Sequence, residues 1–179
     1  MTFEDIVKLR INMRQEHTHY WLSDNFLSWQ WFLLVALNLG ALIVAWIYMD
    51  RKRLLELYTY AGFVLAIGTL LDMLVLHFNF TAYEVSIAPI IPSLVTTSYI
   101  VLPVIYLLIY QYNQSWKHYI FATLISSSFN AFVTETFLIW IGVYQYLKWK
   151  HIYSFFLFLT IGILSKLFIE IVKKCKKNQ

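Results

Sequence analysis

Five long apolar segments, separated by short polar connections, dominate this sequence and limit what it can fold into. Each segment is long enough to cross the hydrocarbon core of a bilayer, which takes about 20 residues of α-helix. The chain is 60% hydrophobic and only 13% charged, whereas about a quarter of the residues of a soluble protein are charged. We therefore expect an all-α integral membrane bundle. Its five transmembrane helices should span about 27–49, 57–78, 93–112, 118–143 and 151–172.

The N-terminal segment 1–26 is too polar to cross a membrane. Residues 2–5, Thr-Phe-Glu-Asp, have the spacing of a helix capping box, and apolar side chains then recur on one helical face. We expect a short amphipathic surface helix that ends between His17 and Tyr20. It is either an anchor on the lipid headgroups or an ordinary solvated extension. Because the segment lacks the apolar core of a signal peptide, no cleavage is expected.

The distribution of Lys and Arg predicts the orientation of the chain. Eight of them belong to the first loop, the third loop and the C-terminal tail, against five on the opposite side of the bundle. By the positive-inside rule, the basic tail 173–179 should be cytoplasmic and the segment 1–26 extracytoplasmic. We expect a multi-pass protein of the plasma membrane, with the lipid bilayer as its main partner.

The connection 79–92 is too short to cross the bilayer and too apolar for an ordinary loop. Pro89 and Pro92 prevent a regular helix across its end. We expect either a shallow re-entrant segment or an extended surface loop over the helix ends. Two small-residue pairs predict close helix packing inside the bundle: Ala36 with Gly40, and Gly62 with Ala66.

Asp72 and Glu135 are carboxylates inside predicted spans, each six or seven residues from the same expected side of the membrane. An ionisable group at the centre of a span costs about 2.5–3.5 kcal/mol, so such residues often mark function. We expect the two to share one depth, in a polar intramembrane cluster with His77, Asn130 and His151. The carboxylates are either a functional site or hydrogen-bonding anchors of the scaffold. If functional, they could share an exchangeable proton.

Lys166 and Glu170 are four residues apart on the fifth predicted span, which makes them a candidate ion pair. Asp72, Glu135, His77 and His151 could in principle hold a metal ion, but no two of them have the spacing of a ligand pair on one helix. We therefore expect no metal and no cofactor. Cys175 is the single cysteine, which excludes an intrachain disulfide.

Several runs of residues resemble those of a known family. The most specific are the tyrosine-rich turn 108–117, LIYQYNQSWK, and the run 149–155, WKHIYSF. From about Met49 to the C-terminus the chain resembles a family of small uncharacterised multi-pass membrane proteins of endospore-forming bacteria (Bacillus and Clostridium type). That family usually has proline where Thr136 and Phe156 stand here. The resemblance implies a bacterial plasma membrane and brings no assigned activity.

Three functional hypotheses follow from these features. The favoured one is a non-enzymatic accessory or assembly subunit that packs against other membrane proteins. The alternatives are binding or transport of a small solute, ion or proton through Asp72 and Glu135, and a lipid-acting intramembrane enzyme using either carboxylate as general acid or base. No nucleophile or phosphate-loop motif is present, so we expect no catalytic residues and no nucleic-acid partner. No internal repeat argues for an inverted-repeat transporter.

Overall fold

The computed structural model describes residues 1–89 and 97–177. The predicted start of the third span at 93 and the end of the connection 79–92, with Pro92, lie outside this range, as do the last two residues of the tail. The elements are, in chain order, α1 (Phe3–Tyr20), η1 (Trp21–Asn25), α2 (Trp29–Tyr48), η2 (Arg51–Arg53), α3 (Leu54–His77), β1 (Thr81–Tyr83), α4 (Thr97–Tyr112), α5 (Trp116–Phe129), η3 (Asn130–Thr134), α6 (Glu135–Trp140), β2 (Tyr144–Tyr146) and α7 (His151–Lys177).

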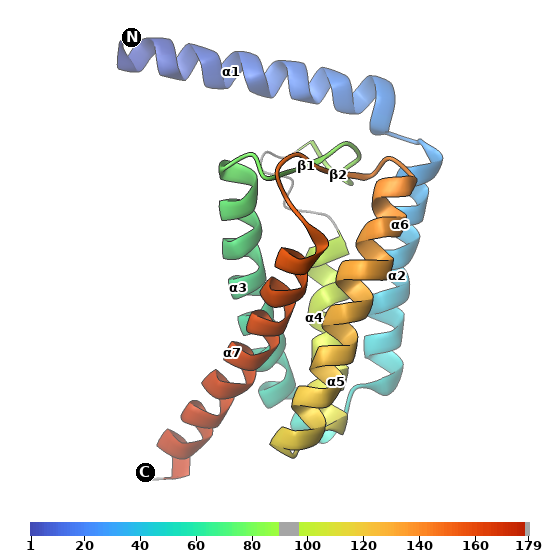
Figure 1. The fold of residues 1–179 in the computed structure, drawn as a ribbon, viewed down its shortest axis with the longest axis vertical. Helices are drawn as coiled ribbons and strands as arrows, with labels where there is room; N and C mark the ends of the chain where they lie inside the picture. The colour runs from blue at the N-terminus through green and yellow to red at the C-terminus, as the bar shows by residue number, and fades with distance from the viewer. Residues whose placement is uncertain (90–96, 178–179) are drawn as a thin grey trace.

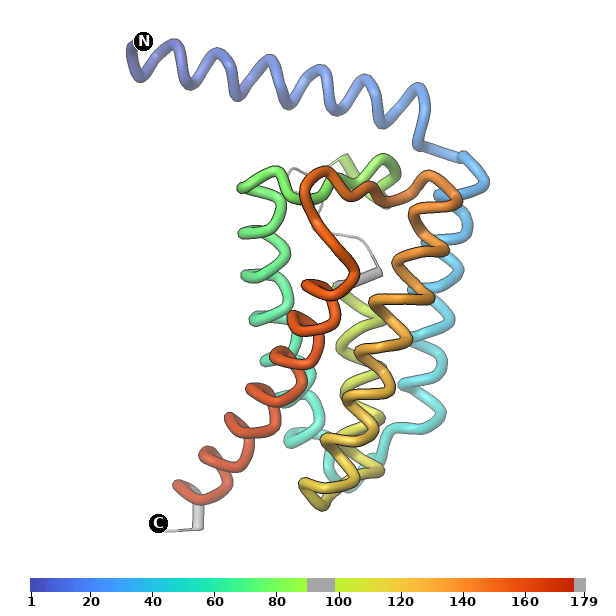
Figure 2. Tube along the Cα trace, in the orientation of Figure 1, coloured from blue at the N-terminus to red at the C-terminus, as the bar shows by residue number. Residues whose placement is uncertain are grey.

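The helices α2 to α7 form one bundle, and its two ends differ in chemistry (Figure 1). At one end lie the strands β1 and β2, crossed by α1; we call it the sheet end. The opposite end carries η2 with Arg51–Arg53 and the last turns of α7; we call it the basic end. The N-terminus lies beyond the sheet end and the C-terminus at the basic end (Figure 2).

The chain is mostly helical, and three described helices are long and apolar enough to cross a membrane: Trp29–Tyr48, Arg51–His77 and His151–Cys175. A fourth apolar helix, Tyr99–Tyr112, is shorter. Such helices satisfy all their backbone polar groups internally, which is what a hydrocarbon environment demands. The all-α expectation is therefore supported, and the chain is compatible with a membrane protein.

The elements α5, η3 and α6 follow one another without a break. Phe129, the residue before η3, has φ −61° and ψ −46°, and Thr134, the last residue of η3, has φ −66° and ψ −49°. These are right-handed helical values, so the backbone turns continuously from Trp116 to Trp140. The element η3 is a π-helical turn, which is wider than an α-helical turn. Such turns within α-helices are found frequently at functional sites. It immediately precedes Glu135.

A two-stranded antiparallel sheet at the sheet end is an addition to the predicted helices. Thr81 pairs with Tyr146, Ala82 with Gln145 and Tyr83 with Tyr144. The sheet occupies residues expected in the connection after the second span and in the link before the fifth. It ties two distant helix ends together by backbone hydrogen bonds.

The two halves of the bundle are an internal repeat with an offset of 63 residues. The first half is α2, α3 and β1; the second is α4, the continuous α5–η3–α6 helix and β2. The helices preceding the strands end at His77 and Trp140, and the strands begin at Thr81 and Tyr144. Both offsets are the same. No repeat was expected from the sequence, because equivalent positions of the two halves seldom carry the same residue.

The same turn closes both repeats. Asn79 (φ 52°) and Gly142 (φ 70°) take the left-handed conformation that ends a Schellman motif. The two hydrogen bonds of the motif occur at equivalent atoms in both halves: Asn79 N to Leu76 O and Phe80 N to Val75 O, and Gly142 N to Ile139 O and Val143 N to Leu138 O.

The strands pair around a local two-fold axis between Ala82 and Gln145. The register is unchanged when the strands are exchanged. The flanking hydrogen bonds are reciprocal, from Glu84 N to Val143 O (3.0 Å) and from Leu147 N to Phe80 O (2.9 Å). Because α3 and α6 run in the same direction toward the sheet (Figure 1), the repeat is parallel and not inverted.

Helix α7 packs against both halves, and two buried tyrosines of the second half donate hydrogen bonds to its backbone. Tyr106 donates to the carbonyl of Phe158 (2.8 Å), and Tyr119 donates to that of Gly162 (2.6 Å). Tyr60 and Tyr119 share a hydroxyl contact of 2.8 Å. All three tyrosine side chains are fully buried, so their hydroxyls need these partners.

The predicted small-residue packing is not where the bundle is tightest. A methyl group added at Gly40 or Gly62 would meet no atom within 4 Å, and Ala36 and Ala66 are exposed. The close approach occurs at Gly162, where a Cβ would lie 2.7 Å from Thr123 and Tyr106 atoms. The expectation that Gly40 and Gly62 pack inside the bundle was therefore wrong.

Candidate functional site

Each repeat delivers one carboxylate and one tyrosine to the sheet end. Asp72 lies five residues before the end of α3, and Glu135 five residues before the end of α6. The Tyr83 hydroxyl donates to Asp72 Oδ1 (2.9 Å). The Tyr146 hydroxyl donates to Glu135 Oε2. We call Asp72 and Glu135 the carboxylate pair.

The Schellman turns explain why the tyrosines reach the carboxylates. Each carboxylate lies on the last turns of its helix, and the chain then reverses at Asn79 or Gly142 into a strand that crosses the bundle end. The third residue of each strand is the tyrosine, eleven positions after the carboxylate in both cases.

The carboxylate pair lines one cavity of about 50 Å³, together with Tyr83, Tyr144 and Ser154. A neighbouring cavity of about 60 Å³ shares Glu135, Tyr83 and Tyr144 and adds Asn130 and Thr134. One water molecule needs about 10–15 Å³ by this measure. The site therefore has room for a few water molecules or a small cation.

No basic side chain neutralises the carboxylate pair in the described chain. Within residues 1–89 and 97–177 the ion pairs join only Glu56 to Arg53 and Lys173, at the other end of the bundle. Glu135 is 9% exposed. Asp72 Oδ2 is buried and has no hydrogen-bond partner among the described residues.

His151 extends the polar contacts from Glu135 toward the surface. Its Nδ1 lies 2.7 Å from the carbonyl of Ala131 and 3.0 Å from the Tyr146 hydroxyl. A carbonyl only accepts, so Nδ1 carries the proton and donates. Glu135, Tyr146 and His151 thus form one hydrogen-bonded chain that ends at a partly exposed ring.

The remaining predicted members of the polar cluster lie in different places. Asn130 donates to the carbonyl of Ser126 (2.9 Å) and lines the neighbouring cavity of about 60 Å³. His77 does not line either carboxylate cavity. It lines an open groove between α1 and α3, with Met13 and His17, because its side chain leaves a different face of the helix than Asp72 does.

Tyr83 and Tyr146 were not among the predicted site residues. A signal was present in the sequence, since both carboxylates are followed by tyrosine at the eleventh position. Only the strand pairing shows that these tyrosines turn back onto the helices.

Burial raises the pKa of Tyr146 above that of an exposed tyrosine, and its hydrogen bond to Glu135 acts in the same direction. Burial also raises the pKa of Tyr144, which lines both cavities. Both hydroxyls therefore keep their protons at neutral pH. Tyr146 is a permanent donor to Glu135.

The predicted ion pair of Lys166 with Glu170 is not formed. Lys166 Nζ donates to the carbonyls of Asn113 (3.2 Å) and Gln114 (2.9 Å) instead. The helix continues past both residues, and the lysine side chain reaches the turn between α4 and α5. The described ion pairs do not include it.

The described residues contain no group of three His, Cys, Asp or Glu side chains that could hold a metal ion. No protein-family model, curated protein or solved structure matches this chain. The functional argument therefore depends on the geometry of the site.

Proposed function

We propose that this chain is a five-span protein of the plasma membrane, with the sheet end outside the cell and the basic end in the cytoplasm. The continuous helix from Trp116 to Trp140 has 25 residues, roughly 37 Å at 1.5 Å per residue. It supports a fourth long span beside the three apolar helices, and α4 supplies the fifth. The N- and C-termini lie at opposite ends of the bundle (Figure 1), as an odd number of spans requires.

We further propose that the protein binds and exchanges protons at the carboxylate pair, as the charge-carrying site of a proton-linked binding or transport protein. One observation carries this proposal: Asp72 and Glu135 line the same cavity, and no basic side chain pairs with either in the described chain. This favours the solute, ion or proton alternative over the accessory subunit.

The physical argument is the cost of an unpaired charge. A buried carboxylate that lacks a cationic partner takes up a proton or attracts a cation. Two carboxylates that share a site titrate as a coupled pair, because the second charge is costly beside the first. The chain from Glu135 through Tyr146 to His151 offers a route for a proton between the cavity and the surface.

The parallel repeat supports one joint site. Each half contributes one carboxylate and one tyrosine donor around the local two-fold axis. The small cavity also argues against a lipid-acting enzyme at this place, since about 50 Å³ does not admit a lipid headgroup.

The test is an infrared titration of the purified protein in lipid nanodiscs, read at the carbonyl stretch of protonated carboxyl groups. We expect a protonated carboxyl signal that is reduced in Asp72→Asn and in Glu135→Gln and is absent in the double variant. Glu56→Gln is the matched control, because Glu56 is ion-paired. A signal that persists in the double variant would contradict the proposal.

Proton flux into liposomes, lost in the double variant and kept in Glu56→Gln, would assign transport.

A second candidate function is the accessory or assembly subunit. The observation that favours it is the open surface at Gly40 and Gly62, where small residues leave space for another helix. Gly40→Leu and Gly62→Leu should not lower the melting temperature of the purified protein, because nothing lies within 4 Å of a Cβ added at either position. In native membranes the same variants should shift the protein to a smaller complex on blue-native gels. An unchanged complex size would remove this candidate.

A further inference from the structure

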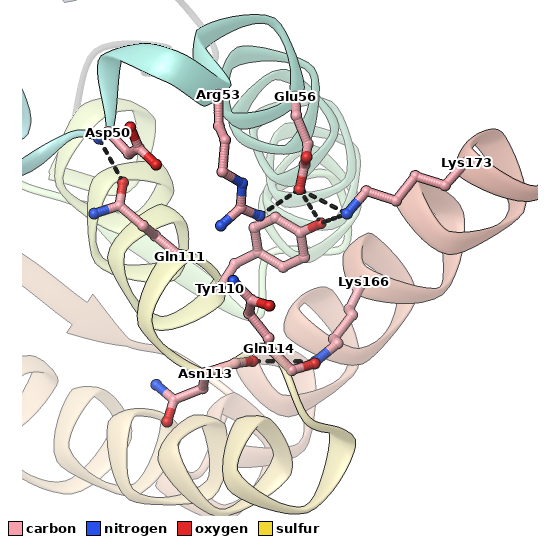
Figure 3. A network of polar contacts seen from close by, with 9 residues as sticks. All are labelled: Asp50, Arg53, Glu56, Tyr110, Gln111, Asn113, Gln114, Lys166 and Lys173. Carbon is pink, nitrogen blue, oxygen red and sulfur yellow. Dashed lines mark hydrogen bonds and ion pairs between the residues drawn. The ribbon is translucent and has the colours of Figure 1, made fainter. Parts of the chain in front are cut away.

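Another cavity, of about 310 Å³, lies at the basic end of the bundle, whereas the carboxylate pair lies toward the sheet end. Charged side chains from η2, α3 and α7 surround it: the cations Arg53, Lys166 and Lys173, and the acids Glu56 and Glu170. Figure 3 shows these elements converging on the ring of Tyr110. The cavity has no part in the function proposed above.

One carboxylate oxygen of Glu56 accepts from three donors of this group. Its Oε1 accepts from Arg53 Nη2 (2.5 Å), Lys173 Nζ (2.8 Å) and the Tyr110 hydroxyl (2.6 Å). The guanidinium of Arg53 and the ammonium of Lys173 also lie 5.8 and 5.6 Å from the centre of the Tyr110 ring. One carboxylate therefore fixes the position of two cations.

Lys166 is held rigidly by neutral groups. It is 2% exposed, and its Nζ donates to the carbonyls of Asn113 and Gln114. The same ammonium lies 4.3 Å from the centre of the Tyr119 ring and 5.0 Å from that of Trp116. Carbonyls and aromatic faces stabilise a cation without cancelling its charge.

The charges of the lining leave one positive charge in excess, since three cations face two acids. The fork of Arg53 also offers more donors than the single N–H group that it gives to Glu56. Guanidinium and ammonium groups are the usual partners of a phosphate oxygen. A ligand with one negative charge and phosphate oxygens would complete the site.

The position of the cavity indicates where such a ligand comes from. It lies at the ends of the helices, where Arg53 of η2 lines it. Arg51 of the same turn lies 5.2 Å from the centre of the Trp46 ring, and aromatic and basic residues mark a membrane interface. Basic pockets between helices on the cytoplasmic side are typical sites for anionic lipid headgroups.

We propose that this cavity binds the phosphodiester headgroup of an anionic phospholipid, of the phosphatidylglycerol type, from the leaflet at the basic end. The phosphate would lie against Arg53 and Lys173, with Lys166 supplying a fixed positive potential. Glu170 would select against headgroups with more than one negative charge.

The test is native mass spectrometry of the detergent-solubilised protein titrated with phosphatidylglycerol or phosphatidylcholine. We expect phosphatidylglycerol to bind more tightly, and Lys173→Gln to weaken its binding about fivefold, as the loss of one basic contact to an anionic lipid does. Lys174→Gln is the matched control, because Lys174 is exposed at the same end and does not line the cavity. Equal losses in both variants would mean general surface attraction and overturn the proposal.

The second measurement separates a lipid from a soluble source of phosphate. Thermal melting of the protein in phosphatidylcholine nanodiscs is followed with and without inorganic phosphate, and compared with nanodiscs that contain phosphatidylglycerol. We expect stabilisation by the lipid and none by free phosphate. Stabilisation by free phosphate alone would overturn the lipid assignment.

Glu170→Gln, which leaves every described hydrogen bond of the cavity in place, should tighten lipid binding; weaker binding would contradict the role given to Glu170.

Discussion

Asp72 and Glu135 occupy equivalent positions of an internal repeat, and each accepts a hydrogen bond from a tyrosine eleven residues further along the chain. The two helices that carry them are joined at the small sheet, where β1 pairs with β2, and both pack against α7. This arrangement brings two carboxylates into one cavity without a basic residue beside them.

The carboxylate pair should lower the free energy of unfolding of the protein. Asp72→Asn and Glu135→Gln keep the shape of each side chain and remove a buried charge or the need for a proton. We expect each variant to melt at the wild-type temperature or higher, with a double-mutant coupling of about 0.5–3 kcal/mol because the groups share a cavity. Circular dichroism melts in mild detergent measure this.

Glu56→Gln serves as the contrasting change in the same melting series. It removes the anion between Arg53 and Lys173, so two cations are left close together. We expect a loss of about 1–2 kcal/mol. If Asp72→Asn and Glu135→Gln lose as much stability as Glu56→Gln, the carboxylate pair is a scaffold element and not a site kept for proton exchange.

Gly142 has a conformation that other residues adopt with difficulty. At φ 70°, Gly142→Ala should cost about 1–2 kcal/mol. Its new Cβ would lie 3.6 Å from Glu84 Oε2, an ordinary contact, so the cost comes from the backbone alone. The equivalent change in the other repeat, Asn79→Gly, should be neutral or stabilising. Chemical denaturation of both variants checks the pair, and a destabilised Asn79→Gly would contradict the role of the turn.

Gly162 should be intolerant of any side chain. The Cβ of Gly162→Ala would lie 2.7 Å from Thr123 Cγ2 and from Tyr106 Cε1, and overpacking of this kind costs about 1–3 kcal/mol. Gly62→Ala is the control, since nothing lies within 4 Å of its added methyl group. Thr123→Ser removes one of the clashing atoms and should restore part of the stability in the double variant. No restoration would locate the tight contact elsewhere.

Alkaline pH should unfold the protein partly through Tyr146. Burial and the hydrogen bond to Glu135 raise the pKa of this tyrosine in the folded state. Its contribution to stability is therefore present below about pH 10, the pKa of an unfolded tyrosine, and is lost as the pH rises toward the folded value. Tyr146→Phe should show a smaller fall in melting temperature between about pH 9 and 11. An identical fall in both proteins would show that Tyr146 does not titrate in this transition.

Cys175 offers a direct test of the proposed orientation. It is the single cysteine and is exposed near the end of α7. A membrane-impermeant maleimide should label it in inverted membrane vesicles and not in intact cells. In a Cys175→Ser background, Ser23→Cys should show the reverse pattern. Labelling of Cys175 from outside intact cells would reverse the orientation of the chain.

Much of the architecture could be predicted, because it depends on local properties of the chain. The lengths of the apolar segments locate the long helices, and the polar connections separate them. Helix α1 ends at Tyr20, within the interval His17 to Tyr20 that was expected. The position of Asp72 and Glu135 near one end of their helices follows from counting residues at a fixed rise.

The partners of these residues could not be predicted in the same way. His77 is close to Asp72 in sequence, but it faces the groove under α1. Lys166 bonds to two carbonyls more than fifty residues away and not to the acid four positions later. Such choices depend on which helix face meets which neighbour, and that is a property of the packed bundle.

The sequence by itself determined that this chain forms long apolar helices with two carboxylates at matching depth, since hydropathy and helical rise act over a few turns. Only the tertiary structure decided that the carboxylates meet. The two left-handed turns return Tyr83 and Tyr146 to the helix ends, and the symmetric strand register brings the halves together. That register depends on hydrogen bonds between segments about sixty residues apart, which no local pattern encodes.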